Sequence, residues 1–208
     1  MTDHTEQRWM NLWKRIGARG DARAVHDDLV ARYSEPHRAY HTLVHIGHCL
    51  DELEQVRQLA ANPDALELAL WYHDAIYDTR AKDNEERSAE LALAAARNAA
   101  LPDSFGKSMA NLIAATKHTA IPADPDTRLL VDIDLAILGQ PEDGFNEYER
   151  QIRREYEWVA EEAFVAGRST ILKSFLHRSA IYSTPFFRSK YEALARRNIA
   201  RSLARLRA

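Results

Sequence analysis

Histidine is concentrated in one short stretch of this chain. Residues 38–48 read RAYHTLVHIGH and hold three of the nine histidines, with a fourth, His37, just before them. The spacings of four, four and three residues match the repeat of an α-helix, so the four imidazoles are expected on one helix face. A row of imidazoles can bind a metal ion, transfer protons, or be an ordinary solvated surface.

The neighbouring residues favour a helix that lies between the core and a polar cleft. At about 100° per residue, one side of this helix collects Leu43, Ile46, Leu50 and Leu53, and the opposite side collects His41, His45, His48 and Glu52. Val44 and Cys49 flank the polar side, and a fully exposed helix does not need such apolar flanks. A solvated surface stripe is the alternative interpretation.

A second polar pair, His73 and Asp74, lies in the apolar segment WYHDAIYD. Leu70 and Ile76 stand three residues on either side of His73. A carboxylate and an imidazole in such surroundings are destabilising unless they are paired or bind a metal. The pair is therefore either a metal site or a satisfied, buried His–Asp pair at the end of a helix.

The segment LLVDIDLAILG offers two more carboxylates, Asp132 and Asp134. On a helix they point about 200° apart, so they cannot serve one metal equally. Asp132 follows Arg128 by one helical turn, so an ion pair with Arg128 would explain a carboxylate at this position. Asp134 shares its face with apolar residues and needs a partner from elsewhere in the chain, such as a metal ion. We prefer Asp134 as the ligand, with Asp132 as the alternative.

The four selected residues form a ligand set of two imidazoles and two carboxylates: His45, His73, Asp74 and Asp134. Mixed nitrogen and oxygen donors suit octahedral Mn²⁺, Fe²⁺, Co²⁺ or Ni²⁺, and can also hold Zn²⁺ or Mg²⁺. A divalent ion with four protein ligands keeps open positions for water and substrate. It lowers the pKa of bound water and supplies hydroxide near neutral pH.

The order His…His-Asp…Asp resembles that of the HD-domain superfamily of metal-dependent phosphohydrolases, and YHTLVHI is similar to the YHxxxH segment of cyclic-nucleotide phosphodiesterases. The later segments REYEWV and FVAGRSTILKSFLHRSAIYSTPFF resemble a bacterial HD subfamily described as predicted metal-dependent phosphohydrolases. The resemblance runs from about Trp9 to the C-terminus. It implies that His45 is a metal ligand and that His41 is the general acid that protonates the leaving oxygen.

Dinuclear phosphodiesterases place a further histidine soon after the His-Asp pair, where residues 75–78 of this chain read AIYD. Asp78, Glu86 and His118 are the remaining candidates for a second metal or for activating water, and Asp78 is the one assigned to catalysis. Each also has a local explanation. Asp78 can end a helix, Glu86 fits a capping box opened by Asp83, and His118 closes a helix, where a cation is favourable.

A phosphate group also requires cationic contacts. Arg38 and Arg178 are the candidates for substrate binding, although arginine on a helix is more often solvated or ion-paired. The histidines outside the proposed site are assigned to the surface or to helix caps: His4, His26, His37, His48 and His177. Cys49, the single cysteine, is expected to be a small packing residue.

The whole chain, residues 1–208, is expected to form one all-α domain, an HD-type helical bundle. Apolar residues recur at helical spacing through most of the sequence, and the β-branched runs and Asn-Gly turns of a sheet protein are missing. Gly139 is expected to end the helix that contains Asp134. The last three helices are expected at about residues 146–158, 158–177 and 185 to the end.

Composition and charge also restrict the possible partners and the location of the protein. A net charge of −3 and a pI near 6.3 give no basic surface for nucleic acid. The sequence has neither a signal core nor an apolar run of about 20 residues, so no membrane association is expected. One cysteine excludes an internal disulfide framework, which favours a cytoplasmic location.

We expect a metal-dependent hydrolase of phosphate mono- or diesters, and the resemblance implies that its small phosphorylated substrate is a nucleotide. A nucleotide-sensing module that keeps the metal but lacks turnover is one alternative. An HD-like iron oxygenase is another. A homodimer is considered, but the sequence does not determine the oligomer.

Overall fold

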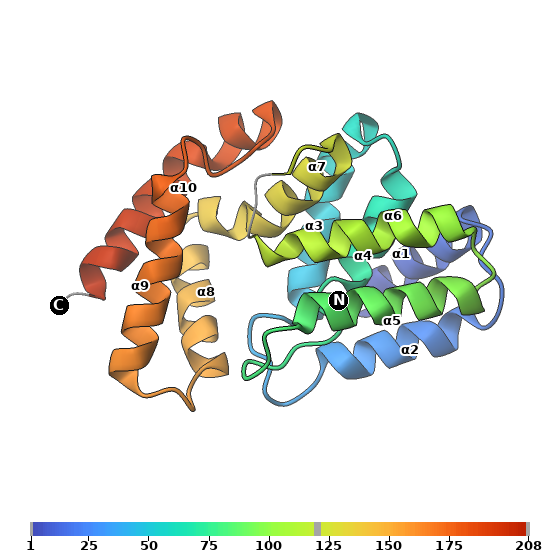
Figure 1. Ribbon diagram of the computed structural model, residues 1–208, viewed down its shortest axis with the longest axis horizontal. Coiled ribbons are helices and arrows are strands. Elements are labelled where there is room, and N and C mark those ends of the chain that lie inside the picture. The colour runs from blue at the N-terminus through green and yellow to red at the C-terminus, as the bar shows by residue number, and fades with distance from the viewer. Residues whose placement is uncertain (1, 119–121, 207–208) are drawn as a thin grey trace. The chain divides into compact units, whose positions relative to one another are not determined.

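The computed structural model describes residues 2–118 and 122–206 (Figure 1). Every regular element in these ranges is an α-helix or a 3-10 helix, and none is a strand, so the all-α prediction is confirmed. The chain divides into two compact units, Met1–Val131 and Asp132–Ala208. That residues 1–208 act as a single HD-type domain stays a prediction.

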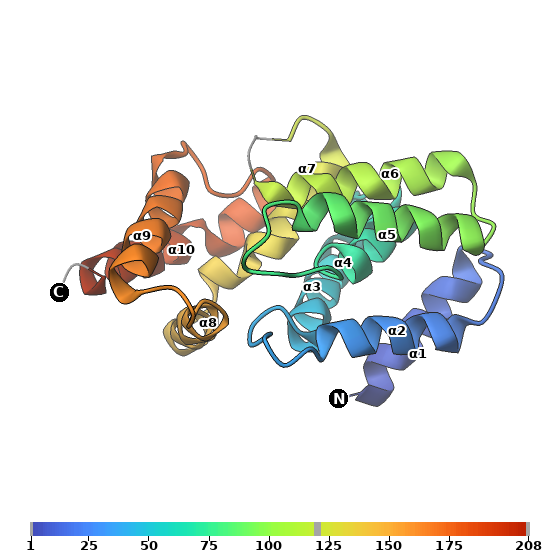
Figure 2. The same cartoon turned by 60° about the horizontal axis from the view of Figure 1, so that its bottom comes forward.

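The first unit is built around α4 (Pro63–Tyr72), which is buried from residue 65 to residue 72. A helix that is apolar on nearly every side belongs in the interior. It packs against α1 (Thr2–Arg15), α3 (Leu43–Val56), α5 (Asn84–Asn98) and α6 (Asp103–Ala114), as Figure 2 shows. The other elements are α2 (Ala22–Tyr33), the start of α7 (Pro125–Asp134), and the 3-10 helices Arg57–Leu59 and Ala115–Lys117.

The histidine-rich helix, α3, begins at Leu43, later than the spacing of the four histidines predicts. Thr42 has an extended backbone, and its hydroxyl accepts a hydrogen bond from the Val44 amide at 3.3 Å, which is the geometry of an N-cap. His37 and His41 therefore precede the helix. The prediction that all four histidines share one helical face is wrong.

His26, assigned above to the surface or to a cap, is buried instead. Its ring lies 6.4 Å from that of Trp9 and 6.0 Å from that of Trp71, centroid to centroid. The buried residues of α2 are His26, Leu29 and Tyr33, at positions i, i+3 and i+7. This apolar periodicity could have identified His26 as a core residue from the sequence.

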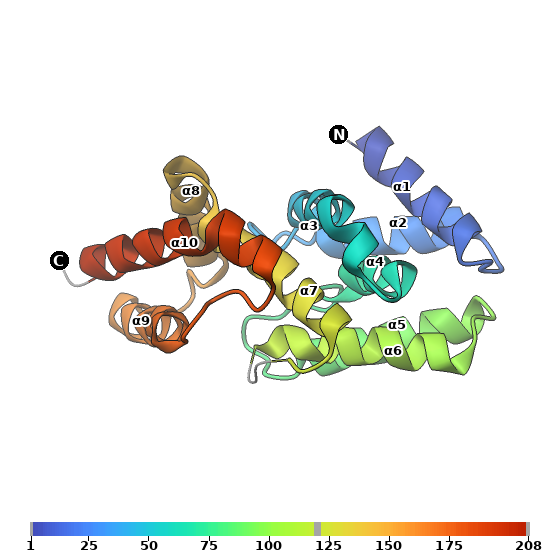
Figure 3. The same ribbon diagram turned by 90° about the horizontal axis from the view of Figure 1, so that it is seen from above.

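The second unit contains a 3-10 helix (Leu135–Gly139) followed by α8 (Glu142–Glu155), α9 (Glu161–His177) and α10 (Pro185–Arg205). These bounds agree with the expected helices to within a few residues. α10 packs against α9 and against the 3-10 helix (Figure 3). Gly139 closes the 3-10 helix, and α7 itself already ends at Asp134, earlier than expected.

None of the described helices is both long enough and apolar enough to cross a lipid bilayer.

Gly139 lies very close to α10 within the second unit. A Cβ atom added to Gly139 would lie less than 3.0 Å from side-chain atoms of Tyr191 on α10. We expect Gly139→Ala to lower the free energy of unfolding by about 1–3 kcal/mol, because the overlap must be relieved by moving packed groups. Urea unfolding followed by circular dichroism measures this change.

Gly167→Ala is the matched control for Gly139→Ala. Gly167 lies inside α9, and an added Cβ there would meet nothing within 4 Å. This substitution should raise stability by about 0.5–1 kcal/mol, because alanine is the better helix former. Equal effects of the two substitutions would show that the close approach of Tyr191 has no energetic consequence.

Candidate metal centre

Helix α3 supplies one imidazole of the candidate site. His45 lies in its first turn and is 3% exposed. The polar line predicted on this helix is not uniform, because His48, three residues later, is exposed. Cys49, one turn after His45, is buried, and its Sγ lies 3.7 Å from His45 Nε2.

The end of α4 supplies the second imidazole. His73 directly follows the last helical residue, Tyr72, and is 1% exposed. Its Nδ1 lies 2.9 Å from the carbonyl oxygen of Leu70. A hydrogen bond there requires the proton to be on Nδ1, which leaves the lone pair on Nε2 in the neutral ring. Metal-binding histidines are commonly oriented in this way by a backbone acceptor.

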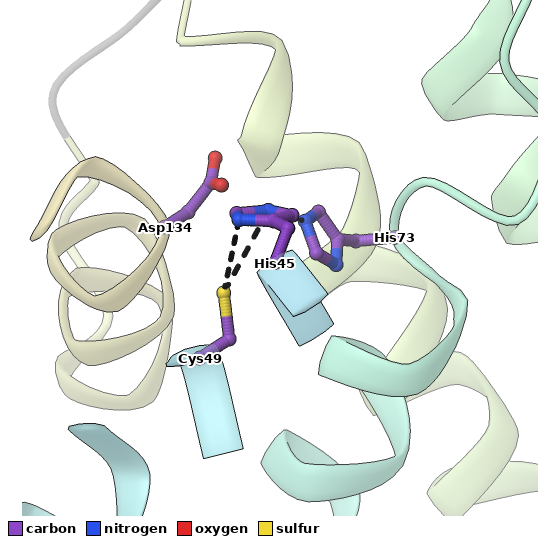
Figure 4. Close-up of side chains that lie close together, drawn as sticks. All are labelled: His45, Cys49, His73 and Asp134. Carbon is purple, nitrogen blue, oxygen red and sulfur yellow. Dashed lines mark hydrogen bonds between the residues drawn. The ribbon is translucent and has the colours of Figure 1, made fainter. Parts of the chain in front are cut away.

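Three potential ligand atoms meet between these two helices. Nε2 of His45 and Nε2 of His73 are 3.1 Å apart, and Figure 4 shows the two rings side by side. Asp74 Oδ2 lies 3.0 Å from the nitrogen of His73 and 3.5 Å from that of His45. A circle through the three atoms has a radius of about 1.9 Å, so one ion slightly out of their plane could reach all three at the roughly 2.0–2.2 Å typical of such bonds.

The carboxyl group of Asp74 is ionised in this environment. Burial alone would raise its pKa, but the imidazoles of His73, His41 and His45 hold the pKa well below its usual range. A carboxylate and two imidazole nitrogens that share one point favour a cation there, either a proton or a metal. The residues present therefore fit a divalent ion, and a satisfied His–His–Asp network is the alternative.

His41 lies next to this group, before the start of α3. Its ring is partly exposed, stacks on Tyr77 at 4.1 Å between centroids, and lies 6.0 Å from the ring of His45. The carbonyl oxygen of Tyr77 is also 2.8 Å from His37 Nε2. Tyr77 was not identified from the sequence, although an aromatic residue four positions after His73 was a visible signal.

Arg38 joins the loop before α3 to the end of α4. Its side chain is fully buried, and its guanidinium donates hydrogen bonds to the carbonyl oxygens of His41 (3.1 Å), Asp74 (2.7 Å) and Ala75 (3.2 Å). It also pairs with Glu35 at 3.0 Å. These contacts give Arg38 a structural role that the sequence did not indicate, while phosphate binding by Arg38 stays a prediction.

We expect Arg38→Lys to destabilise the first unit by about 2–4 kcal/mol, because a lysine cannot reach these separate backbone acceptors in the planar arrangement of a guanidinium. Thermal and urea unfolding measure the loss. Arg87→Lys, at an exposed position of α5, is the control and should change stability by less than about 0.5 kcal/mol. If Arg38→Lys is equally neutral, the described contacts do not hold the loop in place.

Asp78 and Glu86, two of the three candidates for a second metal, have polar partners in the first unit. Asp78 is exposed, and its Oδ1 accepts a hydrogen bond from the Arg80 amide at 2.8 Å. Glu86 pairs with Lys117, which lowers the pKa of Glu86. His118 has a left-handed backbone, with a φ of 54°, directly after a 3-10 helix. Their roles in a second site or in water activation stay predictions.

The predicted capping box at the start of α5 is wrong. Asp83 occupies the N-cap position, but its side chain makes no capping hydrogen bond. Glu86, the other half of the motif, instead extends to Lys117, whose ammonium also donates to the carbonyl oxygen of Lys82 at 3.0 Å. The ion pair links residues distant in sequence, which a local motif does not anticipate.

In the second unit, Asp132 has a structural explanation that differs from the expected ion pair. The Arg128 guanidinium donates to the carbonyl oxygen of Pro122. Asp132 is completely buried and accepts three hydrogen bonds, from the Ser183 amide (2.7 Å), the Thr184 amide (2.7 Å) and the Thr184 hydroxyl (2.6 Å). Burial nevertheless raises its pKa. These bonds fix the start of α10 and occupy the carboxylate that was the alternative ligand.

The second unit also contains Asp134, the predicted metal ligand, and Arg178, a predicted phosphate contact. Asp134 is the last residue of α7. The Arg178 guanidinium lies over the ring of Phe175, 4.7 Å from its centroid, and burial lowers the pKa of Arg178. Metal binding by Asp134 and phosphate binding by Arg178 stay predictions from the sequence.

The residues of the first unit thus form a group of two histidines and a carboxylate, with a thiol beside it, that could bind a metal ion. No family model, no curated protein and no solved structure matches this chain. The function is therefore argued from the geometry of the site and from the sequence patterns.

Proposed function

We propose that this chain is a metal-dependent phosphohydrolase of the HD type. The observation that supports the proposal most directly is the approach of His45, His73 and Asp74, whose donor atoms lie 3.0–3.5 Å apart. Asp134 is proposed as a further ligand on the basis of the sequence pattern. The proposed substrate is a small phosphate ester, and its nucleotide character is supported by the resemblance alone.

Each neighbouring residue has a part in the proposed reaction. A divalent cation, when bound, lowers the pKa of water and supplies hydroxide near neutral pH. Asp74 contributes negative charge, and His73 is oriented by the Leu70 carbonyl. His41, when protonated, donates its proton to the leaving oxygen. Tyr77 stacks on His41 and limits its movement.

The remaining assignments complete the proposal. Asp78 is proposed to activate water, Glu86 and His118 are reserved for a second metal, and Arg38 and Arg178 are proposed phosphate contacts. The single cysteine supports a reducing cytoplasmic location. Neither a nucleic acid nor a membrane is proposed as a partner, and a homodimer is the oligomer considered.

We expect His45→Ala and His73→Ala each to weaken Mn²⁺ or Co²⁺ binding by at least about tenfold, because each removes one donor from a small ligand set. Isothermal titration calorimetry and metal analysis of the full chain measure the loss. His48→Ala is the matched control, since His48 lies on the same helix but is exposed. Wild-type affinity in His45→Ala and His73→Ala would contradict the metal site.

We expect His41→Gln to lower kcat for phosphate-ester hydrolysis by about 10²–10⁴-fold while metal affinity is kept, because a general acid is lost and no ligand is removed. Substrates come from a screen of nucleotides and phosphodiesters with added Mn²⁺, Co²⁺ or Ni²⁺. His48→Gln serves as the control.

Three results would reject this assignment. Full activity in His41→Gln would remove His41 from the mechanism. Nucleotide binding without turnover by the wild-type chain would identify a sensing module. Two iron atoms per chain with oxygen consumption would identify an oxygenase.

A further inference from the structure

Cys49 is a buried thiol for which the proposed function has no use. It is 2% exposed and lies one helical turn after His45 on α3, so both side chains leave the same face of the helix. Its Sγ lies 3.7 Å from Nε2 and 3.8 Å from Nδ1 of His45 (Figure 4). The donor atoms of His45, Cys49 and His73 all lie within 4.8 Å of one another.

The distance between Sγ and Nε2 suits two ligands of one tetrahedral ion, although Sγ is nearly equidistant from the two ring nitrogens and so stands beside the His45 ring. Binding therefore requires the Cys49 side chain to rotate toward the lone pair of Nε2. With a metal–sulfur bond of about 2.3 Å and a metal–nitrogen bond of about 2.05 Å, tetrahedral geometry places the two donors about 3.6 Å apart. The Sγ–Nε2 distance is 3.7 Å.

Charge gives a second argument. Two neutral imidazoles and the Asp74 carboxylate contribute one negative charge, which leaves a divalent cation with one positive charge uncompensated in a buried site. Such a charge is costly to bury. A second anionic ligand would bring the total charge of the ion and its donors to zero; Cys49 is the candidate in the first unit, and the proposed ligand Asp134 is the alternative. The thiol proton passes to solvent as the sulfur–metal bond forms.

We propose that the Cys49 thiolate is a metal ligand, and that it makes the site select a thiophilic cation such as Zn²⁺ or Co²⁺ over Mg²⁺ and Mn²⁺. Thiolates favour the softer ions, whereas Mg²⁺ and Mn²⁺ prefer oxygen donors. This inference rests on the proposed metal site and replaces the packing role expected from the sequence. It does not depend on which phosphate ester is hydrolysed.

Absorption spectroscopy of the full-length chain loaded with Co²⁺ tests the proposal. Visible d–d bands report that Co²⁺ is bound, and near-ultraviolet sulfur-to-cobalt charge transfer reports a thiolate ligand. Because the chain has one cysteine, the charge-transfer band can come only from Cys49. We expect both features in the wild type, and only the d–d bands in Cys49→Ser and Cys49→Ala.

The outcomes separate this inference from the proposed function. Wild-type d–d bands without charge transfer would overturn the role of Cys49 and leave the metal site standing. Charge transfer without hydrolysis of any phosphate ester would support the Cys49 ligand and count against the hydrolase. A chain that binds no Co²⁺ would overturn both.

Two further measurements complement the spectra, and the first of them uses the wild-type chain alone. X-ray absorption of the Zn²⁺-loaded wild-type chain should show a sulfur neighbour at about 2.3 Å, and a shell of nitrogen and oxygen alone would overturn the proposal. Competition titrations should show that Cys49→Ser loses at least about tenfold more affinity for Zn²⁺ than for Mn²⁺. An equal loss for the two ions would contradict a thiolate ligand.

Discussion

Donor atoms of His45, His73 and Asp74 face one another in the interior of the first unit, and their lone pairs repel unless a proton or a metal ion lies between them. The Leu70 carbonyl contributes to this constraint, since it favours the tautomer of His73 with its proton on Nδ1. Burial strengthens the effect, because little water is available to screen it. When neither a proton nor a metal ion is present there, the neighbouring protein must hold the three groups together against their own repulsion.

Arg38 is central to that restraint. Its guanidinium donates hydrogen bonds to the carbonyl oxygens of His41, Asp74 and Ala75. Loss of this donor would be destabilising, because these oxygens lie in or near the interior. The same side chain lies 5.1 Å from the ring centroid of Tyr33. The Arg38 guanidinium thus fixes the backbone on both sides of the group, even though the candidate metal ligands come from separate helices.

Local patterns were sufficient for the helices and for part of the site. Apolar periodicity gave the all-α class and the approximate limits of α8, α9 and α10. The approach of His45 to His73 and Asp74 followed from polar residues placed on otherwise apolar helix faces. Patterns of this kind work because helical side-chain direction depends on residues three or four positions away.

The errors concern partners that are distant in sequence. Nothing near Asp132 indicates that Ser183 and Thr184 will occupy its oxygens, and nothing near Arg38 indicates backbone acceptors at Asp74 and Ala75. The capping box expected for Glu86 failed for the same reason, because its partner Lys117 is distant in sequence. A backbone carbonyl or amide is present at every position, so the sequence does not distinguish the ones that become partners.

The bonds of Asp132 also bear on how the second unit is synthesised. The Ser183 amide follows Asp132 by 51 residues. While the chain is being made, the carboxylate leaves the ribosome long before either of its donors, and an ionised carboxylate without donors is strongly disfavoured in an apolar interior. The end of α7 must therefore stay hydrated until the start of α10 emerges, so this part of the fold can be completed only late in translation.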